Sequence, residues 1–146
     1  MKTVTSRGGQ VQFLLPEDWV VEPSDNGIQA YSPQPASGTL RLDVLTFRLR
    51  SGAAPQSADH LLRRLGGNGE PVPLANGVWM ARYRKESAED GVPNVQTYWH
   101  LGLVRDPEYF EAIFSYTLDQ DQLEEPRHKA DLEMLEREVP AARFAK

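Results

Sequence analysis

The residues best suited to do chemistry are three histidines, His60, His100 and His128, together with the acidic residues near them. A zinc or copper site needs two or more His, Asp or Glu side chains at ligand spacing. Asp59 and His60 are adjacent, so their side chains diverge on a helix. Glu124 lies four residues before His128, a spacing that fits the solvated face of an acidic helix better than a metal site. We therefore expect no bound metal and no other cofactor.

Nucleophilic catalysis by serine needs Ser, His and a carboxylate to converge in space. No serine lies in a G-x-S-x-G elbow, and the glycine-rich segment 66–69 lacks the lysine and the strand-to-helix context of a phosphate-binding loop. Ser115 alone falls on a predicted strand close to the position opposite His100. The sequence therefore favours a protein that is not an enzyme, and the alternative is a small hydrolase that uses His100.

Charge and composition exclude several classes of protein. The chain has 16 basic and 21 acidic residues, a net charge of −5, which disfavours non-specific binding to nucleic acid. It has no cysteine, so disulfides, zinc ribbons and thiol nucleophiles are excluded. No apolar stretch is long enough for a membrane span, and the first residues do not resemble a signal peptide. We expect a cytoplasmic protein, and the preference for Arg over Lys and for Leu over Ile indicates a bacterial origin.

The chain length of 146 residues predicts a single domain, 1–146, with a loose polar lead-in at 1–9. The apolar residues at 58, 61, 62 and 65 predict an amphipathic helix over 58–65, and a second helix is expected over 124–138. Alternating apolar residues predict the strands, which are 10–15, 28–31, 39–50, 70–74, 78–84, 95–104 and 109–116. The predicted fold class is α+β: a single antiparallel sheet of about six or seven strands flanked by two helices.

Two local patterns refine this prediction. Asn76-Gly77 between apolar stretches predicts a hairpin, and residues 85–94 are interpreted as a polar loop. In the strand 39–50 the apolar face changes between Val44 and Leu45. That change indicates either a β-bulge or a strand buried on both faces at its centre.

The register of the last hairpin follows from its turn at 105–108. This turn sets four apolar pairs opposite each other: Val104–Tyr109, Leu103–Phe110, Leu101–Ala112 and Trp99–Phe114. We expect one buried face of the sheet to carry five side chains in particular, those of Trp79, Trp99, Leu101, Phe110 and Phe114.

The order of elements resembles a known family. An apolar strand running into Pro16, Glu17, Asp18 and Trp19 is followed by a long strand, a short amphipathic helix, a three-strand meander and a C-terminal helix ending in Arg143-Phe144. This arrangement, over about residues 10–144, is similar to the PsbP-like superfamily, which includes PsbP, the Ran-binding Mog proteins and DcrB-like bacterial proteins. The resemblance implies an antiparallel sheet flanked by helices and a mostly non-enzymatic binding or chaperone role, with no shared catalytic residues.

The residues that alternate with the core positions define the opposite face of the sheet. The candidate binding residues on it are Met80, Arg82, Tyr98, His100, Glu111 and Ile113. Aromatic, methionine and arginine side chains of this kind are enriched at the centres of protein interfaces. The alternative is that a helix covers this face and buries Met80, Tyr98 and Ile113 as a second core layer.

These observations favour a non-catalytic protein-binding domain with an adaptor, chaperone or immunity-type role. The partner would be another protein, and a homodimer remains open. Besides the hydrolase, a small-ligand carrier with a pocket between the sheet and the C-terminal helix is the remaining alternative.

Overall fold

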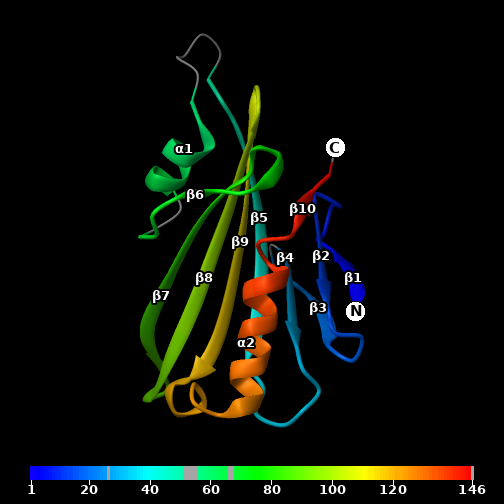
Figure 1. The fold of residues 1–146 in the computed structure, drawn as a ribbon, viewed down its shortest axis with the longest axis vertical. Helices are drawn as coiled ribbons and strands as arrows, with labels where there is room; N and C mark the ends of the chain where they lie inside the picture. Colours follow the sequence, from blue (N-terminus) through cyan, green and yellow to red (C-terminus); the bar gives the residue numbers. More distant parts are fainter. Residues whose placement is uncertain (26, 51–55, 66–67, 146) are drawn as a thin grey trace.

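The computed structural model describes residues 1–25, 27–50, 56–65 and 68–145. They form an α+β fold with two antiparallel sheets, one of seven strands in the order β3-β4-β5-β9-β8-β7-β6 and one of three in the order β1-β2-β10 (Figure 1). The expected class, an antiparallel sheet of about six or seven strands flanked by two helices, is confirmed, and the three-stranded sheet is an addition to it. None of the helices in the described ranges is long and apolar enough to cross a membrane.

The elements follow one another along the chain as two groups separated by helix α1. The first group has five strands: β1 (Lys2–Thr5), β2 (Val11–Leu15), β3 (Val20–Ser24), β4 (Gly27–Tyr31) and β5 (Thr39–Arg48). After α1 (Ala58–Leu65) come β6 (Val72–Pro73), the 3₁₀ turn η1 (Ala75–Gly77), β7 (Trp79–Glu89), β8 (Val92–Arg105), β9 (Glu108–Asp119), η2 (Gln120–Gln122), α2 (Pro126–Glu138) and β10 (Arg143–Phe144).

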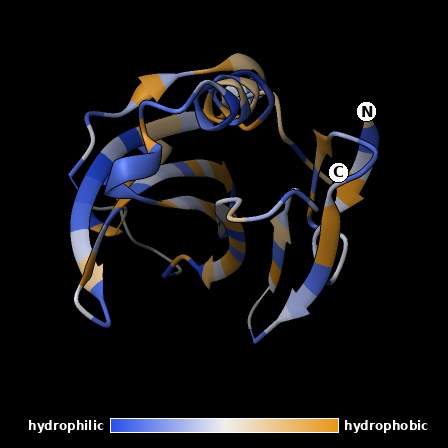
Figure 2. Cartoon of the chain, turned by 90° about the horizontal axis from the view of Figure 1, so that it is seen from below, coloured by the Kyte–Doolittle hydropathy of each residue, from blue (hydrophilic) through white to orange (hydrophobic). Residues whose placement is uncertain are grey.

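The large sheet is built around the long antiparallel strands β5, β9, β8 and β7. The β8–β9 register places Trp99 opposite Phe114 and His100 opposite Ile113, as the sequence predicts. Seen end-on, the hydrophilic strand β7 forms one side of the molecule, and the small sheet forms the other side, near both chain ends (Figure 2). The large sheet has two faces, and different elements pack against each of them.

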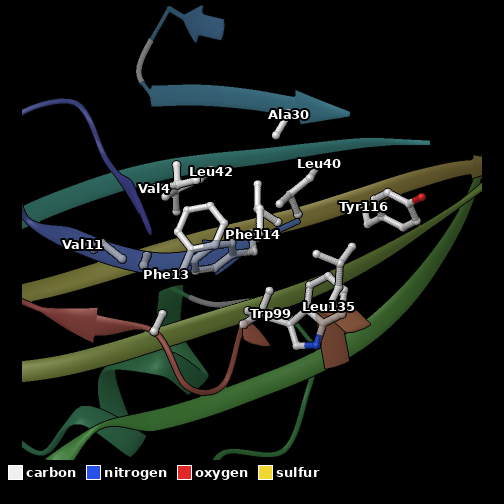
Figure 3. Close-up of a cluster of buried hydrophobic side chains, with 14 of the residues drawn as sticks. Val4, Val11, Phe13, Ala30, Leu40, Leu42, Trp99, Phe114, Tyr116 and Leu135 are labelled. Atoms are coloured by element: carbon white, nitrogen blue, oxygen red, sulfur yellow. The ribbon is translucent and has the colours of Figure 1, made fainter. Parts of the chain in front are cut away.

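One face of the large sheet packs against α2 and the small sheet and holds the main hydrophobic core. Phe13 of β2 meets Phe114 edge-on, with ring centroids 5.1 Å apart, and Leu135 of α2 belongs to the same buried cluster as Trp99 (Figure 3). Full burial of Trp99, Leu101 and Phe114 confirms those members of the predicted core. Phe110 lies on the same face but is half-buried.

Trp79 does not belong to this face. It lies opposite Gly102 in the β7–β8 register and packs instead against Ala58 and Leu61 of α1, on the other side of the sheet. The prediction for Trp79 was wrong because the side chains of β7 alternate in the opposite phase to the one assumed. Met80, its neighbour, packs against the main core.

Two other expectations are corrected by the structure. The lead-in 1–9 contains strand β1, which pairs with β2 from Lys2–Leu15 to Thr5–Gln12, so it is not loose. Residues 85–94 are not a polar loop, because β7 and β8 continue through them to a tight turn at Asp90-Gly91. Both turn residues have positive φ, 51° and 79°, as a two-residue hairpin turn of type I′ requires.

In β5 the apolar residues switch from one face of the strand to the other between Val44 and Leu45. Neither a β-bulge nor burial of both faces explains this switch. The pairing of β5 with β9 runs without interruption from Thr39–Thr117 to Arg48–Glu108, so there is no bulge. Leu45 and Phe47 point to the face opposite the core and are 37% and 39% exposed. The strand therefore carries an apolar surface on its outer face.

Candidate functional site

The face of the large sheet that is turned away from α2 is only partly covered. Helix α1 packs over one end of it, where Ala58 and Leu61 contact Tyr109, and where Leu62 lies close to Gly102. Towards the Asp90-Gly91 turn, this face carries the side chains of β7, β8, β9 and β5 without a covering helix in the described part of the chain. We call this uncovered part the open face.

A chain of four hydrogen-bonded side chains crosses the strands beside α1. The hydroxyl of Tyr83 lies 3.0 Å from Nε2 of His100, and Nδ1 of His100 lies 3.2 Å from Oε2 of Glu111. The hydroxyl of Tyr109 donates to Oε1 of Glu111 at 2.7 Å. His100, Glu111 and Tyr109 are all buried, so each polar group is satisfied by another member of the chain.

The acceptor-only chemistry of a carboxylate fixes the direction of these hydrogen bonds. Nδ1 of His100 therefore donates to Glu111, and Nε2 faces the hydroxyl of Tyr83. Burial raises the pKa of the Tyr83 phenol, so its hydroxyl stays protonated and can donate. Burial, and next the hydrogen bond to Glu111, raise the pKa of Tyr109. The network therefore engages both ring nitrogens of His100.

Three aromatic rings form a stack at the edge of the open face. Tyr83 and Tyr98 lie parallel, with centroids 5.0 Å apart and an interplanar angle of 9°. Tyr83 also stacks on His100 at 5.4 Å, and the hydroxyl of Tyr98 donates to Gln96. Both tyrosines are half-buried, so part of each ring is accessible to solvent. The hydrogen bonds to His100 and Gln96 fix their orientation.

The structure brings together four of the six predicted binding residues. Tyr98, His100, Glu111 and Ile113 share one face, and the cross-strand pairs Tyr98–Ser115 and His100–Ile113 are those expected. Ile113 is half-buried beside the stack, so α1 does not bury it as a second core layer. Exposed Leu45 and Phe47 of β5 lie on the same face, but nearer to α1, opposite Glu111 and Tyr109.

Met80 and Arg82 lie on the other face, because Met80 is opposite Leu101 and Arg82 is opposite Trp99. Arg82 forms an ion pair with Glu136 of α2, and Glu136 also accepts a hydrogen bond from the indole of Trp99 at 3.0 Å. Their assignment to the binding face was wrong for the reason given for Trp79. Both residues help to fasten α2 to the sheet instead.

Sequence reasoning missed Tyr83 and Gly102 as parts of this arrangement. A Cβ atom at Gly102 would lie 2.6 Å from the hydroxyl of Tyr109 and 3.1 Å from Cγ of Leu62. Glycine at this position therefore makes room both for the hydrogen bond to Glu111 and for helix α1. The turn signal Asp90-Gly91, read as a hairpin, would have placed Tyr83 opposite Tyr98.

The other sequence candidates do not form a chemical site. His128 is fully buried, and its Nε2 lies 3.1 Å from a carboxylate oxygen of Glu125, not of Glu124. Within the described ranges no three His, Cys, Asp or Glu residues cluster as metal ligands would. Ser115 lies opposite Tyr98, while the hydrogen bonds of His100 run to Tyr83 and Glu111.

Comparison with known proteins places the fold but not the activity. No family model matches the chain, and no curated protein matches its sequence. A crystal structure from Bacteroides thetaiotaomicron VPI-5482 superimposes on 99% of the chain with a TM-score of 0.64 and 16% identity. LpqN of Mycobacterium tuberculosis, a protein involved in cell envelope biogenesis, superimposes on 93% of it with a TM-score of 0.64 and 11% identity.

The chain spans 48% of the Bacteroides protein and 83% of LpqN. At these identities the likeness concerns the fold alone. The resemblance to the PsbP-like superfamily and the cytoplasmic location stay predictions.

Proposed function

We propose that this chain is a non-catalytic protein-binding domain that uses the open face of its large sheet. The observation that carries the proposal is the pair of half-buried stacked tyrosines, Tyr83 and Tyr98. Exposed Leu45 and Phe47 lie on the same face of the sheet, nearer to α1, opposite Glu111 and Tyr109. Rigid aromatic rings supply a large contact area and lose little conformational entropy on binding. The hydrogen bonds from Tyr83 to His100 and from His100 to Glu111 hold the Tyr83 ring in a fixed position in the unbound protein.

The charges around this surface indicate what kind of protein it would accept. Arg41 lies opposite Ser115, and Lys85 lies opposite Gln96, so two exposed basic residues flank the tyrosine pair. Neither is paired with an acidic residue in the described part of the chain. The proposed partner is a protein segment with apolar side chains at its centre and acidic residues at its margins.

The two alternatives fit the arrangement less well. A serine hydrolase would need the nucleophile's hydroxyl on Nε2 of His100, whereas Nε2 faces the phenol of Tyr83. Ser115 lies opposite Tyr98 and has no hydrogen bond to His100 among the described residues. The space between β7 and α2 has a volume of about 380 Å³ and is lined mainly by charged side chains, which suits an apolar ligand poorly. Its lining includes Arg84, Lys129 and Glu133.

A photo-crosslinking amino acid at position 98 tests the proposal, with the same amino acid at the exposed position 14 of the small sheet as the control. A protein captured only through position 98 is then purified and its affinity measured by calorimetry. The double variant Tyr98→Ala/Leu45→Ala should weaken binding at least about tenfold. The matched double variant Leu14→Ala/Val72→Ala, which truncates exposed apolar residues elsewhere, should leave the affinity unchanged. Equal effects of the two double variants would contradict the proposal.

A further inference from the structure

Strand β7 has a long unpaired edge. The two-residue strand β6 pairs only with Trp79 and Met80, and no other described strand lies beyond β7. Residues from Tyr83 to Glu89 therefore present one side of their backbone without a strand partner in the described part of the chain. Such an edge is a template for another strand.

The pairing with β6 determines which backbone groups point outward. The N–H of Leu74 donates to the carbonyl of Val78 at 2.7 Å, so Val78 directs its carbonyl to the outer side. Backbone direction alternates along an antiparallel strand, so Met80 and every second residue after it also point outward. A Cβ atom at Gly69 would lie 2.7 Å from both N and O of Arg82, which agrees with this phase. The free outward groups belong to Arg84, Glu86 and Ala88.

We propose that a second copy of this chain pairs with this edge, β7 against β7, across a two-fold axis at Ser87. In an antiparallel pair of identical strands related by a two-fold axis, the residue on the axis lies opposite the same residue of the other copy. An axis at Arg84, Lys85 or Glu86 would therefore place like charges together, and an axis at Ala88 would set Glu86 opposite Asp90. Like charges directly opposite destabilise a strand pair.

The axis at Ser87 avoids every one of these repulsions. It sets Lys85 of each copy opposite Glu89 of the other, which gives two attractive pairs by symmetry, and it sets Glu86 opposite Ala88. The outward N–H and C=O groups of Glu86 and Ala88 then exchange hydrogen bonds across the axis. The charges on this edge therefore favour the register with its axis at Ser87 over the registers with an axis at residues 84, 85, 86 or 88.

The dimer joins the two large sheets into one. Side chains of Lys85, Ser87 and Glu89 lie on the same face as Tyr83, so the open faces of the two copies would form one continuous surface. The interface is short, and we expect a weak, reversible dimer. This inference does not depend on the proposed binding of another protein, because it concerns the purified chain alone.

Sedimentation velocity over a range of protein concentrations tests the dimer by charge exchange. Wild-type protein should self-associate, and Lys85→Glu alone or Glu89→Lys alone should weaken association at least about tenfold, since each variant makes both pairs repulsive. Mixing the two single variants should restore a dimer, because the carboxylate introduced at position 85 of one copy then faces the ammonium group introduced at position 89 of the other. The double variant Lys85→Glu/Glu89→Lys should restore it as well, since both of its pairs are again attractive.

A backbone variant provides the second test. Ala88→Pro removes an N–H group that points away from β8, so the hairpin should keep its circular dichroism spectrum while the dimer is lost. A wild-type protein that stays monomeric at the highest soluble concentration would overturn the proposal. So would a dimer that survives both single charge variants and Ala88→Pro, since it would have to use another surface.

Discussion

Replacing Tyr109 by Phe removes one oxygen atom from the hydrogen-bond network beside helix α1. Tyr109 is fully buried, and its hydroxyl is 2.7 Å from Oε1 of Glu111, which is 1% exposed. Without that donor the carboxylate oxygen is left buried and unsatisfied. An unsatisfied buried charged group costs about 2–3 kcal/mol, and we expect the free energy of unfolding to fall by about that much.

Urea unfolding at neutral pH, followed by tryptophan fluorescence and circular dichroism, measures this change. The matched control is Tyr98→Phe, the same chemical change at a half-exposed site where water can replace the hydrogen bond to Gln96. It should cost less than about 0.5 kcal/mol, and the denaturant slope m should be the same for both variants. Equal losses for the two variants would refute the reasoning that burial of Glu111 sets the cost.

Three further changes test other parts of the structure. Gly102→Ala would bring a methyl group against Tyr109 and Leu62, so it should destabilise the protein by about 1–3 kcal/mol and increase hydrogen exchange in α1, as measured by mass spectrometry. Arg82→Ala removes an ion pair between two partly exposed side chains and should change the free energy of unfolding by less than about 1 kcal/mol in urea titrations. Burial raises the pKa of Asp131 in the folded state, so the folded protein favours the protonated acid and stability falls as pH rises from the ordinary aspartate pKa through the raised one. Asp131→Asn should therefore raise the melting temperature at pH 7 but not at pH 3, and an equal shift at both pH values would contradict this assignment.

The sequence predicts best those strands whose apolar residues alternate regularly on one face and whose connecting turn is short. The β8–β9 pair has both, and its register agrees residue by residue with the alternation of Trp99, Leu101 and Leu103. Helix α1 has the predicted bounds, 58–65, because four apolar residues at helical spacing are followed by glycine. The small sheet was not predicted, since β1 and β10 are too short and too polar to show a period of two.

Strand β7 shows why the candidate site was only partly predicted. The first residues of β7 are apolar on both faces of the strand, so their alternation alone does not determine which face enters the core. Val78 and Met80 lie on one face, and Trp79 and Ala81 lie on the other. The Asp90-Gly91 turn does fix it, because a two-residue turn sets Glu89 opposite Val92 and determines every pair that follows.

The charged residues before that turn are the reason why the end of β7 was interpreted as a loop. The sequence Lys85-Glu-Ser-Ala-Glu89 is polar throughout, and polar segments between apolar ones are normally loops. A strand can be polar on both faces only where neither face enters the core, and all five residues are exposed. Their charges are then free to serve another purpose. On an unpaired edge, that purpose is to determine which strand can pair there and in which register, and this is the property that the charge-exchange experiment measures.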